Sequence, residues 1–138
     1  MRFGAPDLSG DNAVVAPYAI EDPFQLADAR QMDVVQDGSV ALVVTSPPYF
    51  AGKAYETDLE AGHIPSTYLE YLTMLRDVFA ECLRVLEPGG RMCVNVANLG
   101  RKPYRSLAGD VTTILQDELA MLLRARRAFL RRGVPITR

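Results

Sequence analysis

DGSVALVVTSPPYF, residues 37–50, encloses a short apolar run between two signals that break regular structure. Asp37-Gly38 predicts a turn before the run, and Ser46-Pro47-Pro48 ends it. The run itself, Val40–Val44, is rich in valine and does not alternate with polar residues. That pattern is typical of a β-strand covered on both faces, as in a parallel sheet. We therefore expect a buried strand over residues 40–44.

Residues 67–86 predict a helix, because apolar side chains recur there at spacings of three and four. Thr67 and Glu70 have the spacing of a capping box at its start. Pro88-Gly89-Gly90 is expected to end the helix and turn the chain. The predicted apolar stripe comprises Leu69, Leu72, Leu75, Phe79, Cys82, Leu83 and Leu86.

Three further elements complete the pattern. Residues 91–97 predict a second strand, and residues 24–29 a shorter strand that ends at Asp28. Asp110 is a candidate N-cap for a last helix that runs through Leu119. The order strand, loop, helix, turn, strand, helix predicts an α/β domain with a largely parallel sheet. Functional loops are then expected at the carboxyl ends of the strands.

Composition narrows the class of protein. The chain has 138 residues, 49% of them hydrophobic, and a formal net charge of −2, which suits one globular domain. Cys82 and Cys93 are too few for a disulfide scaffold and are expected in the core, so a reducing cytoplasm is predicted. With one histidine, no metal site is expected. No apolar run approaches the ~20 residues of a membrane span, so no membrane partner is expected.

Charge is distributed unevenly along the chain. Residues 1–121 hold all 17 acidic side chains and 9 of the 15 basic ones, whereas residues 122–138 hold six arginines and no acidic residue. A basic end can bind phosphate backbones. These arginines lack interleaved aromatic residues that would stack on bases, so the pattern favours a solvated or self-neutralising end.

The loop after the first strand carries the chemistry. Two consecutive prolines fix two φ angles and remove two backbone donors. They leave the Ser46 hydroxyl and the Pro47 carbonyl as acceptors, and Tyr49 follows as an aromatic surface. This clamp would suit an exocyclic amino group on a planar ring, which becomes a nucleophile as its lone pair leaves conjugation. A proline-stiffened strand end with no chemical role is the alternative interpretation.

The wider context resembles a known family. TSPPYF after a strand, with RVLEPGG about forty residues later, is similar to the amino-group DNA methyltransferases, which modify N4 of cytosine or N6 of adenine. The resemblance covers roughly residues 24–120. It implies a partial Rossmann-like methyltransferase fold, S-adenosylmethionine as the methyl donor and DNA as the partner. It also implies base flipping, because the target atom is inaccessible inside a duplex.

The resemblance assigns roles to individual residues. Ser46, Pro47, Pro48 and Tyr49 would be the catalytic clamp, with Tyr49 stacked on the flipped base. Serine at the first clamp position is similar to the cytosine-N4 subgroup, although a hydroxyl does not settle the base. Asp28 would contact the adenine side of the cofactor, and Thr45 is a second candidate for cofactor binding; a surface carboxylate is the alternative for Asp28.

Two departures from the family pattern bear on activity. The family's aromatic-x-Gly-x-Gly cofactor loop is missing, since the sequence contains no Gly-x-Gly. The expected continuation after about Met121 is replaced by LLRARRAFLRRGVPITR. We therefore divide the chain into an irregular N-terminal arm (1–23), a partial methyltransferase catalytic domain (24–121) and a basic C-terminal tail (122–138).

The sequence thus predicts a site-specific DNA methyltransferase, with N4 of cytosine as the expected target, in an incomplete chain that is expected to be inactive alone. A missing C-terminal half or a second chain would complete it. The alternatives are a non-catalytic fragment and an N6-adenine enzyme. Methylation of an RNA or protein nitrogen is disfavoured by Ser46, because asparagine is usual at that position in those relatives.

Overall fold

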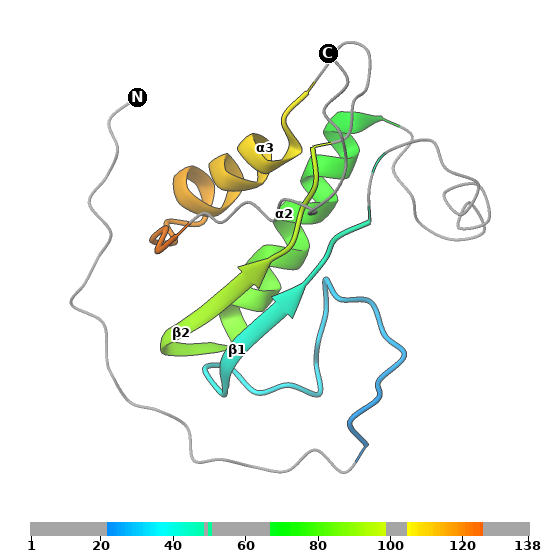
Figure 1. Cartoon of the computed structure of the whole chain (residues 1–138). Coiled ribbons are helices and arrows are strands. Elements are labelled where there is room, and N and C mark those ends of the chain that lie inside the picture. The colour runs from blue at the N-terminus through cyan, green and yellow to red at the C-terminus, as the bar shows by residue number, and fades with distance from the viewer. Residues whose placement is uncertain (1–21, 49, 51–66, 99–104, 126–138) are drawn as a thin grey trace, which may run out of the picture.

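The computed structural model describes residues 22–48, 50, 67–98 and 105–125. Its elements follow one another as strand β1 (Val40–Thr45), helix α2 (Tyr68–Val85), strand β2 (Leu86–Val94) and helix α3 (Leu107–Thr113), as Figure 1 shows. A π-helical turn, η2 (Ile114–Glu118), continues α3. This order confirms the predicted α/β class and forms part of a Rossmann-like fold.

The two strands are parallel and share one irregularity. Val40 pairs with Leu86 and Leu42 with Arg91, so β2 holds extra residues between these pairs. Gly90 is required there, because a Cβ atom would lie 2.8 Å from the Glu87 carbonyl oxygen and 3.1 Å from that of Val40. The predicted turn at residues 88–90 is therefore wrong: these residues form a bulge inside β2, which runs over 86–94 instead of 91–97.

Helix α2 confirms the prediction for residues 67–86. Thr67 accepts a hydrogen bond from the Glu70 backbone, and the Glu70 carboxylate accepts one from the Thr67 backbone, so the capping box is complete. The predicted stripe is only partly right, because Leu69 is 74% exposed. The buried face is instead Tyr71, Leu75, Phe79, Cys82 and Val85.

Helix α3 begins at a different cap from the one predicted. Ser106 is the N-cap, and its hydroxyl accepts a hydrogen bond from the Gly109 backbone at 3.2 Å. Asp110 lies within the first turn, where its carboxylate accepts hydrogen bonds from Tyr68 and Arg105. The prediction that Asp110 caps this helix is wrong, because tertiary partners hold its side chain.

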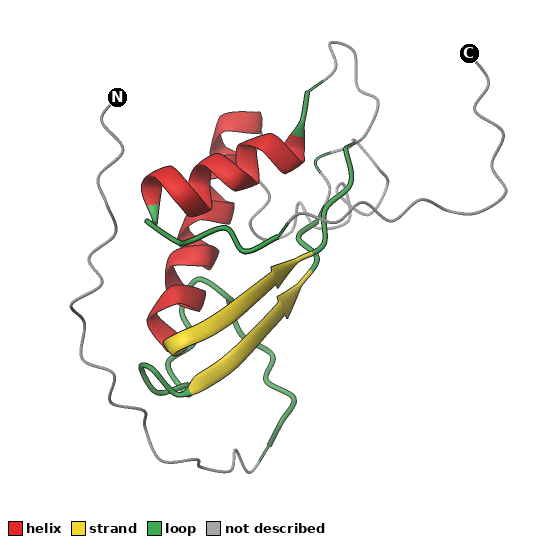
Figure 2. Ribbon diagram, turned by 60° about the vertical axis from the view of Figure 1, so that its left-hand side comes forward, coloured by secondary structure: helices red, strands yellow, loops and turns green. Residues whose placement is uncertain are grey.

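Both helices lie on one side of the strands, as Figure 2 shows. Between them is a buried cluster, against which Met92, Val94 and Val96 pack from the sheet side. The members of the cluster are Tyr71, Leu75, Phe79, Leu107, Val111 and Ile114.

The opposite face of the sheet is uncovered among the described residues. Leu42 is 56% exposed and Val44 is 70% exposed, and their partners in the register, Arg91 and Cys93, are exposed as well. The prediction of a strand covered on both faces is therefore wrong on one face. The same holds for Cys93, which was expected in the core; Cys82 is buried as expected.

The segment before β1 is attached to the end of α2 by polar contacts. Arg84 donates to the carbonyl oxygens of Met32 and Val35, each at 3.1 Å, and pairs with Asp37. Glu81 accepts from the Met32 backbone at 2.7 Å and from Arg84. These contacts fix the approach of the chain to the first strand.

The predicted strand over residues 24–29 is wrong, because these residues have no regular structure. Asp22 and Asp28 instead accept hydrogen bonds from the backbone two residues further on, which is the local bonding that competes with a strand. Phe24 is 87% exposed. No helix within the described ranges is long and apolar enough to cross a membrane.

Candidate active site

The predicted clamp begins at the carboxyl end of the parallel strands. Thr45 is the last residue of β1, and its carbonyl oxygen accepts a hydrogen bond from the Asn95 backbone at 2.9 Å. Ser46, which follows at once, is exposed, whereas Pro47 is buried. The structure thus puts the Ser46-Pro47-Pro48 loop at the carboxyl ends of the strands, where the sequence predicted it, with the serine accessible to solvent.

Tyr71, on the buried face of α2, anchors this loop. Its hydroxyl donates to the Pro48 carbonyl oxygen at 2.6 Å, and its side chain is 2% exposed. The predicted apolar stripe does not include Tyr71, because it runs through Leu69 and Leu72. The signal was present, since Tyr71 lies four residues before Leu75 and therefore belongs to the same helical face.

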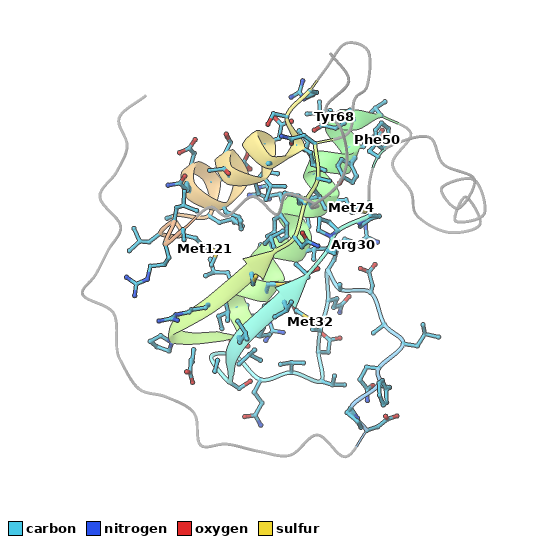
Figure 3. The ribbon with its side chains drawn as sticks, in the orientation of Figure 1. Arg30, Met32, Phe50, Tyr68, Met74 and Met121 are labelled. Carbon is cyan, nitrogen blue, oxygen red and sulfur yellow. The ribbon has the colours of Figure 1, made fainter. Side chains whose placement is uncertain are left out.

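Phe50 provides a second anchor on the other side of position 49. Its ring is stacked on that of Tyr71 at 5.3 Å between centroids, and it meets the ring of Tyr68 edge-on at 5.7 Å. Figure 3 shows Phe50 and Tyr68 close together at the start of α2. The residues on both sides of Tyr49 are thus held by α2, while Tyr49 itself lies outside the described residues.

Tyr68 links α2 to the start of α3. Its hydroxyl donates to the Asp110 carboxylate at 2.6 Å, and the Arg105 guanidinium lies 4.6 Å above its ring. Burial, followed by the hydrogen bond to Asp110, raises the pKa of Tyr68 to about 12. The phenol is therefore neutral at physiological pH and acts as a hydrogen-bond donor, so it does not supply a general base.

Asn98 follows β2 and lies at the same carboxyl end of the sheet as the clamp loop. Its side-chain oxygen accepts from the Ala108 backbone at 3.0 Å and from the Ser106 hydroxyl at 3.4 Å. It therefore binds donors at the start of α3, where helical N–H groups have no partner within the helix. The end of β2, the clamp loop and the first turns of both helices are joined by side-chain contacts.

The two predicted cofactor residues have different surroundings. Asp28 pairs with Arg30, whose Nε lies 3.0 Å from both carboxylate oxygens, and the pair occupies a turn instead of a strand end. Thr45 is half-buried at the end of β1. Cofactor binding by these two residues stays a prediction. Within the described part of the chain, no group of three or more His, Cys, Asp or Glu side chains could hold a metal ion.

Comparison with known proteins identifies the arrangement. Residues 40–126, which contain the clamp, both strands and both helices, match the family model N6_N4_Mtase, DNA methylase. The chain belongs to this DNA methylase family. The match begins at the first residue of β1, so Ser46 and Tyr71 lie inside the region that defines the family, and Asp28 lies outside it.

Relatives of this DNA methylase chain are type II methyltransferases. M.BglI from Bacillus subtilis is 32% identical over 83 residues, M.Cfr9I from Citrobacter freundii is 36% identical over 72, and M.MjaI from Methanocaldococcus jannaschii is 35% identical over 97. The matches cover 59%, 50% and 54% of this chain. They cover only 22%, 24% and 32% of the respective relatives, so the chain spans at most about a third of their length.

A solved structure agrees with the fold. A crystal structure from Thermus thermophilus, assigned as a DNA modification methylase, superposes with a TM-score of 0.52 and is 29% identical. The superposition covers 67% of this chain and 38% of that one. The DNA methylase fold therefore explains the β-α-β-α arrangement, and the solved protein contains a larger part that this chain does not match.

Proposed function

We propose that this chain is the catalytic-loop part of a site-specific DNA methyltransferase that methylates an exocyclic amino group of a flipped base. The observation that carries the proposal is the Ser46-Pro47-Pro48 loop at the carboxyl edge of the sheet, anchored by the hydrogen bond from Tyr71 to Pro48. Ligand sites of open parallel sheets lie at this edge. The family membership supports DNA as the substrate.

In this proposal the clamp orients the amino group. The Ser46 hydroxyl and the Pro47 carbonyl accept its two N–H hydrogens, and Tyr49 stacks on the ring. These acceptors favour a pyramidal nitrogen whose lone pair is free to attack, so orientation supplies much of the rate. The neutral Tyr68 gives no base, and we propose that the extra amine proton leaves to water after transfer.

The methyl donor implied by the family is S-adenosylmethionine, an electrophilic methyl carrier. We infer that this chain supplies only part of its binding site. The sequence has no Gly-x-Gly loop, which is the feature that lets backbone approach a nucleotide closely. The carboxylate of Asp28 is already paired with Arg30. We therefore propose that the donor is held mainly by a further methyltransferase segment, in a second chain or a missing half.

We make two more specific proposals, one about the target base and one about the location in the cell. Ser46 at the first clamp position favours N4 of cytosine, and N6 of adenine is the alternative. The cytoplasm is the proposed location, in keeping with two free thiols. A non-catalytic methyltransferase fragment is the competing function, favoured by the same missing glycine loop.

A chimeric enzyme tests the proposal. The segment of this chain that matches M.Cfr9I replaces its counterpart in that enzyme, and transfer of a labelled methyl group to duplex DNA is measured. We expect activity that is reduced by Ser46→Ala and retained with the control Thr73→Ala, an exposed change on α2. A folded chimera that is inactive, or one that is unaffected by Ser46→Ala, would favour the non-catalytic alternative.

A further inference from the structure

The uncovered face of the sheet has a defined composition. In the register, Leu42 is opposite Arg91 and Val44 is opposite Cys93, and all four side chains are exposed. Side chains alternate across a strand, so the intervening residues lie on the opposite side of the sheet. Of these, Met92 and Val94 pack against the cluster between the helices. We call Leu42, Val44, Arg91 and Cys93 the outer face.

Such a face is unusual for a parallel sheet in isolation. Parallel sheets occur almost only with both faces covered, and their strands are apolar throughout for that reason. Val40–Val44 has this all-apolar composition, yet the described helices cover one side only, as Figures 1 and 2 both show. Each strand also has a sheet neighbour on one side only among the described residues. The composition of the outer face is thus typical of a sheet face covered by further polypeptide, which the described residues do not supply.

The proteins that this chain resembles are longer than the segment they share with it. This chain matches only 22–32% of the length of three type II methyltransferases and 38% of a solved methylase. The remaining parts of those proteins belong with a segment that resembles β1, α2, β2 and α3. A partner of this kind needs an apolar surface that covers Leu42 and Val44, and a strand that pairs with the open edge of the sheet.

We propose that the outer face is the docking surface for the complementary part of a methyltransferase, which covers Leu42, Val44 and Cys93 as it completes the sheet. This inference rests on the proposed function in assuming that the chain works as part of a larger methyltransferase. It assigns the partner to one side of the sheet, opposite α2 and α3. It leaves the clamp accessible, since the clamp lies beyond the carboxyl end of β1.

Cys93 supplies the reporter for a test. It is exposed on the outer face, opposite Val44 in the register, whereas Cys82 lies on the buried face of α2 and serves as an internal reference. The full chain is co-expressed with either of two probes: the part of M.MjaI, or of M.Cfr9I, that lies outside its match to this chain. Alkylation of Cys93 by a maleimide is then followed by mass spectrometry.

The expected result is co-purification with at least one probe and slower alkylation of Cys93 in the complex. The slowing should be at least about tenfold, as for a chain that is nine-tenths bound. Val44→Glu should abolish both effects. The matched control Leu69→Glu should change neither, because Leu69 is 74% exposed, close to the 70% of Val44, but lies on α2.

Three results would overturn the inference. They are no co-purification with either probe, a complex in which Cys93 reacts as fast as in the chain alone, and equal effects of Val44→Glu and Leu69→Glu. Protection of Cys93 in the chain alone would also contradict the proposed partner. If that protection rises with protein concentration, a second copy of the chain covers Cys93. If it is independent of concentration, a segment of the same chain covers Cys93. Docking without methyl transfer refutes only the proposed function.

Discussion

The hydroxyl of Tyr71 donates a hydrogen bond to the carbonyl oxygen of Pro48 at 2.6 Å, across 23 positions of sequence. This contact ties the buried face of α2 to the loop that carries the clamp. Because Tyr71 is 2% exposed, the bond is shielded from water. The core of the domain and the geometry of the candidate site therefore depend on the same side chain.

The first prediction concerns this bond. Tyr71→Phe keeps the ring that stacks on Phe50 but removes the donor, so it should lower the free energy of unfolding by about 1 kcal/mol, a typical net value for one hydrogen bond. Tyr71→Ala should cost about 3–5 kcal/mol, because it also leaves a cavity. Urea denaturation measures both changes.

Thr73→Ala is the control for this series. Thr73 is on the exposed side of α2, where its hydroxyl donates to the Leu69 carbonyl. Such a surface change is expected to stay within about 0.5 kcal/mol. If Tyr71→Phe is no more destabilising than Thr73→Ala, the bond to Pro48 contributes nothing to the fold.

The second prediction concerns the stability of the folded chain at acidic pH. Hydrogen bonds from Arg84, and then from the Met32 backbone, lower the pKa of Glu81 from its ordinary 4.5 to about 2. A lowered pKa means that Glu81 stabilises the folded state above the unfolded pKa. That contribution is lost as the pH falls from about 4.5 towards 2. We expect the urea midpoint to fall across this range.

Glu81→Gln should flatten that part of the pH profile, since glutamine does not titrate. Glu87→Gln, a change in the bulge of β2, is the matched control, and the fall of the urea midpoint that Glu81 produces should persist in it. An unaltered profile in Glu81→Gln would show that other carboxylates govern acid unfolding. The profile is measured by urea denaturation at each pH.

The third prediction concerns the cofactor. Because the chain lacks a Gly-x-Gly loop, we expect titration calorimetry with S-adenosylmethionine to show weak or undetectable binding to the isolated chain. Methylation of DNA by the isolated chain should likewise be undetectable. Micromolar binding would contradict this prediction and would mean that a different surface holds the cofactor. Asp28→Asn would then show whether that surface includes Asp28.

The sequence predicted those parts of the fold that depend on neighbours in the chain. The capping box of Thr67 and Glu70 and the strand at residues 40–44 are local signals, and the structure has both, with the strand extended to Thr45. Asp110 was misjudged because its partners, Tyr68 and Arg105, come together only in the folded domain. Cys93 was misjudged because an apolar pattern does not reveal whether a covering layer is present.

In the candidate site, too, the parts that are local in sequence were predictable and the tertiary contacts were not. The clamp was recognisable because Ser46-Pro47-Pro48 is continuous in sequence and follows a strand. Its anchors were not, since Tyr71 and Phe50 meet the loop through tertiary contacts. An aromatic residue at a helical spacing is usually a core residue. In Tyr71 that role and a contact to the clamp loop coincide, which the sequence alone does not distinguish.

The last prediction concerns the clamp in the M.Cfr9I chimera described above. Tyr49→Ala should lower kcat/KM for DNA by about ten- to a hundredfold, because stacking of a base on an aromatic ring is worth ~1–3 kcal/mol. Tyr49→Phe keeps the ring and should retain most of the activity. Ser46→Ala should slow transfer while the pocket keeps its shape, since one acceptor for the amine disappears.

Labelled-methyl transfer to duplex DNA compares the three variants with the unmodified chimera. All three should remain folded, which circular dichroism checks, because the exposed Ser46 contributes little to the core and α2 anchors the loop through its neighbours Pro48 and Phe50. A larger loss for Tyr49→Ala than for Tyr49→Phe separates stacking from a role of the phenol hydroxyl. Full activity in both Tyr49→Ala and Ser46→Ala would mean that the loop is only a stiff end of β1, and that the amine is oriented elsewhere.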